Sequence, residues 1–290
     1  MTENTGAPVR AQSPAAHGPA AHGPAAAAAK ARRWGAFYYM EHVLLVMKGY
    51  SWSLLMYSVG HPVAYLFAMG VGLATLVDAQ GAGAFGGVGY VTFVAPALLV
   101  SAAVMTAANE FTFPVMAGFK WRRTYYGPHA SPMTPRQIAA GHVMAVTLRF
   151  LLQSAVYFAA VALFGAAPGG WGWVTILVAT LAALSFGLPL MAYSASITED
   201  KGQFALVMRF IVMPLFLFSG TFFPLDSLPL AVRWIGWISP IWHGTELGRV
   251  FTYGYQEPAL LTVLHVVVLA DLAVAGWFLT RRQFAVRMGR

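Results

Sequence analysis

Six long apolar stretches constrain the fold more than any other feature of this chain. Hydrophobic residues make up 58% of the sequence and charged residues only 10%, whereas about 25% of an ordinary soluble domain is charged. A helix of about 20 apolar residues crosses a hydrocarbon core of about 30 Å. The sequence therefore predicts an all-α, polytopic membrane protein. The predicted spans are Ser53–Val77, Tyr90–Ala108, Gly141–Phe164, Trp173–Ser196, Phe204–Phe223 and Leu260–Thr280.

The N-terminal segment differs in composition from the rest of the chain. Residues 1–33 are rich in Ala, Pro, Gly and His and lack large apolar side chains, so burial cannot offset the entropy cost of ordering them. We therefore expect a disordered cytoplasmic tail over residues 1–33 and one membrane domain over residues 34–290. His17 and His22 have no third ligand nearby, which favours a solvated linker over a metal site.

A short amphipathic helix is predicted before the first span, from Trp34 to Lys48. Apolar side chains recur at helical spacing between Ala36 and Met47, while Glu41 and Lys48 share another face. This pattern predicts a helix that lies along the membrane surface. The alternative is that the segment forms the cytoplasmic start of the first span.

The distribution of basic residues predicts the orientation. An even number of spans places both termini on one side, and short cytoplasmic loops carry most Lys and Arg residues of a membrane protein. With both termini in the cytoplasm, only Arg233 and Arg249 of the 18 basic residues fall on the outer side. The net charge of +8 therefore reflects membrane topology, and no interaction with nucleic acid is expected.

The run from Phe204 to Phe251 contains an unusual element. The fifth span is followed by a Pro- and Trp-rich stretch that is too short and too interrupted to cross the bilayer again. This pattern predicts a re-entrant or interfacial helical hairpin on the outer side, before the last span. Its candidate functional residues are Asp226, Arg233, Trp234, Trp237, His243, Glu246 and Arg249.

Four Phe residues crowd the outer half of the fifth span, where they either line a pathway for an amphiphile or face lipid. They are Phe216, Phe218, Phe222 and Phe223.

Two ionisable residues also fall inside predicted spans, where charge is costly. At about 1.5 Å per residue, Arg149 and Asp271 lie roughly 12–15 Å from the inner ends of their spans, so an ion pair between them is one option. The other is that Arg149 extends to the inner headgroups.

The segment from Asn109 to Ala140 is the longest predicted cytoplasmic loop. It mixes aromatic residues with Lys and Arg, and aromatic and Arg side chains are enriched where protein surfaces dock. The alternative is a basic flank that binds lipid headgroups. Thr134, Pro135 and Gln137 match a helix N-terminus with a capping box, so we expect a helix to begin there.

Motifs of the common hydrolytic enzymes are missing. The nucleotide-binding motif G-x-x-x-x-G-K-[ST] places Lys directly after Gly, and none of the four Lys residues follows Gly. H-E-x-x-H and G-x-S-x-G are also absent. Because Cys is absent as well, thiolate metal sites are excluded. The sequence predicts no enzyme activity, and no cofactor or metal held by this chain.

The hairpin carries a family resemblance. LFLFSGTFFPLDSLPLAVRWIGWISPIWHGTELGRV, with six spans and a long first cytoplasmic loop, resembles the membrane permease of type-2 ABC exporters. HPVAYLFAMGVGL and MTAANEFTFPVMAGFKWRRTYY are similar to the nodulation-factor, or lipo-oligosaccharide, exporter branch, and daunorubicin-type drug exporter permeases are next nearest. The resemblance covers residues 34–290, with a poor match over residues 127–135.

The resemblance implies a multi-pass permease of the bacterial plasma membrane. Two copies, expected to form a homodimer, would sit on two cytoplasmic ABC ATPase subunits that hold ATP and Mg. A pathway would form between the second and fifth spans, with the hairpin near its outer gate. Arg233, Glu246 and Arg249 would there meet a substrate headgroup or stabilise the hairpin. The coupling helix would fall within Val115–Tyr126. The implied coupling residues are Glu110, Phe119, Lys120, Trp121, Arg122, Arg123 and Tyr125.

The expected function is export of a lipid-linked or amphipathic substrate, such as a glycolipid, a lipo-oligosaccharide or a drug, out of the cytoplasm or the inner leaflet. A separate ATPase would supply the energy. The alternative is a secondary carrier or channel that needs no ATPase. A carrier is expected to bury a coupling-ion site near the midplane, and Asp271 is the only deep acidic residue of the predicted spans.

Overall fold

The computed structural model describes residues 23–56, 60–78, 85 and 87–289, and none of these residues is in a strand. Within this part of the chain, four helices are long and apolar enough to cross a membrane. They are α5 (Tyr90–Glu110) continued by α6 (Phe113–Lys120), α8 (Pro135–Leu163), α9 (Val174–Ser196) and α14 (Ala259–Met288). The all-α prediction is confirmed, and these helices coincide with the second, third, fourth and sixth predicted spans.

The regions of the other two predicted spans contain shorter helical pieces. The first holds α2 (Ser51–Leu55), α3 (His61–Phe67), a π-helical segment (Ala68–Leu73) and α4 (Ala74–Asp78), and residues 57–59 between them lie outside the description. The fifth holds α10 (Gln203–Val207), a π-helical segment (Met208–Val212) and α11 (Met213–Phe218). Six complete spans therefore stay a prediction.

The fifth predicted span ends earlier than expected, at Phe218 instead of Phe223. Gly220 adopts a φ of 72°, a left-handed conformation that ends helices and suits glycine. The π-helical segment directly precedes the helix that holds Pro214, whose missing N–H interrupts the regular hydrogen-bond ladder. Phe222 and Phe223 consequently belong to a turn and not to a membrane helix.

The first helix, α1 (Pro24–Lys48), begins at Pro24, so the start predicted for it at Trp34 is wrong. Proline suits the first position of a helix, and the Ala run that follows has the highest helix propensity. Residues 1–22, including His17 and His22, lie outside the described residues. The predicted position of α1 on the membrane surface stays a prediction.

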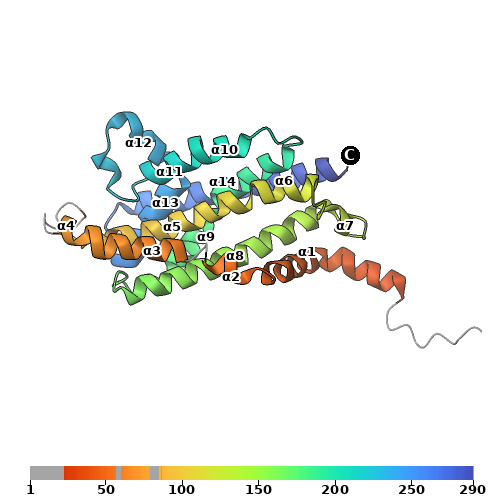
Figure 1. Ribbon diagram of the computed structural model, residues 1–290, viewed down its shortest axis with the longest axis horizontal. Coiled ribbons are helices and arrows are strands. Elements are labelled where there is room, and N and C mark those ends of the chain that lie inside the picture. Colours follow the sequence, from red (N-terminus) through yellow and green to blue (C-terminus); the bar gives the residue numbers. More distant parts are fainter. Residues whose placement is uncertain (1–22, 57–59, 79–84, 86, 290) are drawn as a thin grey trace, which may run out of the picture.

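Helix α1 packs along α8 (Figure 1). The N-terminus of α8 has the predicted capping box, in which the side chains and backbone N–H groups of Thr134 and Gln137 bond reciprocally. The Gln137 side chain also donates to the Arg32 carbonyl at 2.6 Å. A Cβ on Gly141 would lie 2.4 Å from the Ala36 carbonyl oxygen, so the missing side chain lets the two helices meet at their backbones.

The core lies between α5, α9, α14 and α13 (Pro240–Tyr253). Small residues allow close contact: a Cβ on Gly276 would lie 2.4 Å from Cδ of Pro189, and one on Gly244 would lie 2.7 Å from Cγ1 of Val100. Helices of membrane proteins often associate through such small residues, because lipid competes with large apolar side chains.

Figure 1 shows two ends of the bundle. One end carries α4 and α12 (Leu230–Trp237), and the segment predicted as a hairpin holds α12 and α13, preceded by a 3-10 turn at Leu225–Ser227. The opposite end carries α6, α7 (Tyr126–His129) and the C-terminus. This segment contains two helices. A re-entrant hairpin that enters a membrane leaflet stays a prediction.

Candidate functional sites at the two ends of the bundle

The end that carries α6 and α7 is built on a buried aromatic cluster. Phe119 and Tyr125 are only 3% and 2% exposed, and their ring centroids lie 4.5 Å apart. Phe284 of α14 lies 4.8 Å from Phe119, and the Arg287 guanidinium lies 4.5 Å above the same ring. Burial raises the pKa of Tyr125 well above its usual value, so its phenol stays neutral. These two predicted coupling residues therefore hold the loop against α14.

Another part of the same loop is exposed and forms the basic-aromatic patch, defined as Phe113, Lys120, Trp121 and Arg122. The Phe113 and Trp121 rings are each half-exposed and lie 5.3 Å apart. The Lys120 ammonium lies 5.5 Å from the Trp121 ring centroid. Phe113 was absent from the predicted coupling set. Phe113 precedes Trp121 by eight residues, a spacing that brings both side chains to the same face of a helix, and this spacing could have identified Phe113 from the sequence.

Arg123, next to this patch, is the only non-Gly residue with a positive φ, 51°, among the described residues. Such a conformation costs about 1–3 kcal/mol and persists only where the surroundings impose it. The Arg123 carbonyl accepts from Tyr126 N–H at 3.1 Å, which closes the turn into α7.

Glu110 occupies the last position of α5 and forms an ion pair with Arg149 of α8. The predicted alternative, an ion pair of Arg149 with Asp271, is therefore wrong: Asp271 is exposed on α14. The side chains of Arg149 and Glu110 are largely buried, so each charge offsets the desolvation of the other. Glu110 thus ties α5 to α8 and does not contribute an exposed carboxylate to the loop.

At the hairpin end, Arg233 fixes the turn before α12. Its guanidinium donates to the Leu228 carbonyl at 2.7 Å and to the Asp226 carbonyl, and lies 3.4 Å from the exposed Asp226 carboxylate. Trp234 and Trp237 are about half-exposed on one face of α12. Indole rings on an amphipathic helix suit the headgroup level of a membrane.

Helix α13 is buried, in contrast to α12. Arg249 is 2% exposed and pairs with Glu246 at 2.7 Å. Its guanidinium also donates to the Gly220 carbonyl at 2.6 Å and lies 3.7 Å from the Phe93 ring centroid on α5. Of the two predicted roles for Arg249 and Glu246, the burial favours stabilisation of the hairpin over contact with a substrate headgroup.

His243 takes part in a second buried polar chain. Its Nε2 lies 3.0 Å from the Trp237 carbonyl, which can only accept, so Nε2 carries the proton and Nδ1 accepts from His265 Nδ1–H at 2.7 Å. The other nitrogen of His265 lies 3.4 Å from Glu257, whose carboxylate also accepts from Thr262 at 2.7 Å. His265 and Glu257 were not predicted, because their distance from His243 in sequence gave no signal.

The remaining predicted pathway residues lie where α11 ends. Phe216 and Phe222 make an edge contact at 5.3 Å, and Phe222 makes another with Tyr65 of α3 at 6.0 Å. Phe218 and Phe223 are partly exposed. Nearby, a buried Ser219 hydroxyl donates to Ser239, the N-cap of α13, at 2.6 Å, which links the turn after α11 to the hairpin.

Comparisons with known proteins agree with the sequence resemblance. The family described as "ABC-2 type transporter" matches residues 41–253. Nodulation protein J of Rhizobium meliloti (strain 1021) is 24% identical over 258 residues, which cover 88% of this chain and 94% of that protein. Nodulation protein J of Bradyrhizobium diazoefficiens is 24% identical over 267 residues, 90% of this chain and 96% of that protein. The protein of the same name from Rhizobium leguminosarum bv. viciae is 24% identical over 232 residues, 79% and 85% of the two chains.

Proposed function

Because the chain belongs to the ABC-2 type transporter family, we propose that it exports an amphipathic, lipid-linked substrate with energy from a separate ATPase. As an ABC-2 membrane permease, it is a transport subunit without an ATPase domain, and its family implies an ABC ATPase as partner. The relatives named nodulation protein J agree with the sequence resemblance to the nodulation-factor exporter branch, which implies a lipo-oligosaccharide or similar glycolipid as the substrate class. A drug is the second substrate class that the sequence resemblance suggests.

The observation that carries the proposal is the division of the α6–α7 end into a rigid base and an exposed patch. Phe119, Tyr125 and Phe284 form the buried base, and the basic-aromatic patch lies on its surface. Exposed Trp and Arg side chains are typical anchors of protein interfaces. We propose that the ATPase binds this patch, because a force applied to the patch would be transmitted through the buried base to α14 and through α6 to α5.

The proposed orientation places this end in the cytoplasm and the hairpin end outside. Basic residues then gather on the inner side, in agreement with the positive-inside rule. The chain is proposed to form one membrane domain from residue 34 onward, in the plasma membrane of a bacterium. ATP and Mg would bind only to the partner ATPase.

A second copy of the chain is proposed to complete the pathway. Helix α5 is mostly buried, whereas the helical region from α10 to α11 exposes apolar side chains, including Leu206, Phe210 and Met213. We propose that this α10–α11 face meets the second copy, and the Phe216–Phe222 contact lies at the proposed outer end of that face. A homodimer built there would place two hairpins around one outer opening.

The test uses the permease purified with its ATPase in proteoliposomes. Trp121→Ala and Arg122→Gln are expected to weaken co-purification with the ATPase and to lower its turnover at least tenfold. Trp171→Ala and Arg282→Gln are matched controls, because both residues are exposed and lie outside the patch. Normal binding and turnover in both patch variants would refute the coupling assignment.

A transport assay separates an ATP-driven exporter from a self-sufficient carrier. A fluorescent lipid-linked oligosaccharide is expected to cross the bilayer only when the ATPase and ATP are present. Transport that persists without the ATPase would favour the carrier. Because the chain has no Cys, single-Cys variants at Ser227 and Arg282 report sidedness directly, and labelling of Ser227→Cys from the cytoplasm would contradict the orientation.

A further inference from the structure

A pocket between α1 and the turn before α8 is not explained by the coupling surface. Its lining residues are Tyr38, Tyr39, His42, Arg123, Thr124, Gly127, Pro128 and Met133. Arg123, which was predicted to couple to the ATPase, thus lines a pocket that faces α1. No Asp or Glu is among the described residues that line this pocket. It therefore offers one guanidinium, one imidazole and several hydroxyl groups to a negatively charged ligand.

The backbone at Arg123 supports a specific role for this side chain. A left-handed conformation is unfavourable for a residue with a Cβ. Among the described residues, Arg123 is the only non-glycine residue that adopts it. Such strain is concentrated at ligand sites, where a conformation is held for function. Here it accompanies a side chain that lines the pocket wall next to His42 of α1.

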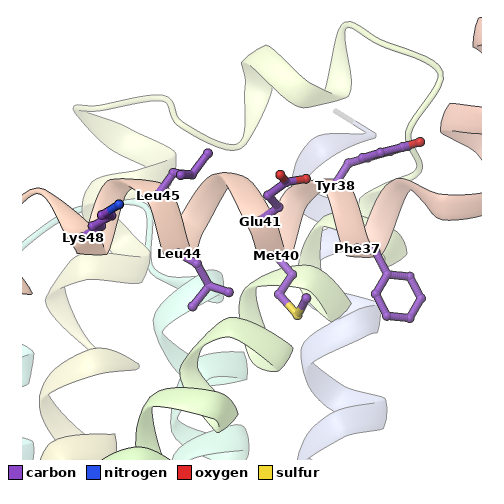
Figure 2. Close-up of a pocket in the computed structure, with 7 residues that line it drawn as sticks. All are labelled: Phe37, Tyr38, Met40, Glu41, Leu44, Leu45 and Lys48. Carbon is purple, nitrogen blue, oxygen red and sulfur yellow. The ribbon is translucent and has the colours of Figure 1, made fainter.

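An apolar groove adjoins the pocket, because Tyr38 lines both. Figure 2 shows the groove residues on α1, with Phe37, Met40 and Leu44 on one side of the helix and Tyr38, Glu41 and Leu45 on the other. Phe37 and Leu45 are 48% and 62% exposed. Large exposed apolar side chains on a helix of a membrane protein are suited to contact with acyl chains.

We infer that this pocket and groove together bind one anionic glycerophospholipid of the inner leaflet. The phosphate would lie against Arg123 and His42, and an acyl chain would follow Tyr38 and Leu45 along α1. A lipid fits better than the ATPase, because a basic pocket without acidic lining residues adjoins, at Tyr38, a groove that is apolar except for Glu41 and Lys48. The inference rests on the cytoplasmic placement of this end, which the proposed function requires.

The test is native mass spectrometry of the purified full chain with phosphatidylglycerol or phosphatidylcholine added separately. Arg123→Asn is the diagnostic variant, because Asn removes the charge yet tolerates a positive φ. It is expected to weaken phosphatidylglycerol binding about fivefold, the effect of one cation near an anionic headgroup, and to leave phosphatidylcholine binding unchanged. Leu45→Gln is expected to weaken both lipids alike.

Arg136→Asn is the control, because Arg136 is an exposed cation at the start of α8 that does not line the pocket. Equal losses for Arg123→Asn and Arg136→Asn would overturn the inference, since they would indicate only general surface attraction. Displacement of phosphatidylglycerol by millimolar inorganic phosphate would also overturn it in favour of a free anion. Loss of the lipid on addition of the ATPase subunit would instead assign the pocket to that protein. These results do not depend on ATP turnover, so failure here is distinct from failure of the coupling assignment.

Discussion

Replacing Arg249 with Met is expected to lower the free energy of unfolding by about 3–5 kcal/mol, the usual cost of breaking a buried ion pair from one side. The Arg249 and Glu246 side chains are 2% and 11% exposed, so water cannot replace the guanidinium. The substitution leaves the Glu246 carboxylate buried without its counter-charge and removes the donor to the Gly220 carbonyl.

Two further variants separate the cost of the unpaired buried charge from the cost of the lost hydrogen bond. In the double variant Glu246→Leu with Arg249→Met no charge remains buried, so the expected loss falls to about 1–3 kcal/mol, the cost of the unsatisfied Gly220 carbonyl. Arg233→Gln removes an ion pair of the same hairpin whose carboxylate, Asp226, is 95% exposed. There the lost ion pair is expected to cost at most about 1 kcal/mol, and the Gln amide can still donate to a carbonyl of the turn.

The measurement is reversible unfolding in mixed micelles with increasing SDS, followed by far-UV circular dichroism. All variants are compared at the same total detergent concentration. The reasoning is refuted if Arg249→Met costs no more than Arg233→Gln, or if the double variant is less stable than Arg249→Met alone. Either result would mean that the α13 pair is solvated in the folded protein.

Three further predictions concern other contacts. Gly141→Leu is expected to cost about 1–3 kcal/mol and to loosen α1, because its side chain meets the Ala36 carbonyl; Gly127→Leu is the control in open space, and limited proteolysis near α1 reports the difference. Burial raises the pKa of Tyr125, so the neutral phenol stabilises the folded state fully below a pH of about 10, and this contribution is lost as the pH rises further. In alkaline titration followed at 295 nm, the wild type and Tyr125→Phe should ionise the same number of phenols while folded, and the variant one fewer after unfolding. His265→Leu removes the donor to the buried His243, and a loss of about 1–3 kcal/mol in the SDS assay is expected, whereas an unchanged midpoint would contradict the assigned tautomers.

The parts of the fold that sequence predicts well are those encoded locally. Four apolar stretches became long helices, and the Thr134 capping box lies where its short motif placed it. Hydropathy works because a bilayer requires each spanning helix to satisfy its own backbone. The start of α1 was missed, because a composition of Ala, Pro and Gly indicates disorder until a packing partner such as α8 is known.

The candidate sites depend on contacts that are distant in sequence. Glu110 and Arg149 are 39 residues apart, and Arg249 and Phe93 are 156 apart. The sequence pattern singled out the loop between α5 and α8, which is proposed to be cytoplasmic, but gave Phe119 and Trp121 the same role, although one is buried and the other is half-exposed. Burial of this kind is decided by α14, which follows the loop by more than a hundred residues.

The glycine contacts of the core restrict where a substrate can travel. At Gly276 and Gly244 even one added carbon atom would overlap Pro189 or Val100, so these seams cannot admit a methylene group. At these two points, α14 therefore meets α9 and α13 meets α5 without a gap for a substrate chain. An acyl chain of the proposed substrate would therefore pass over the outside of the bundle at these points, where the proposed second copy would cover its other side.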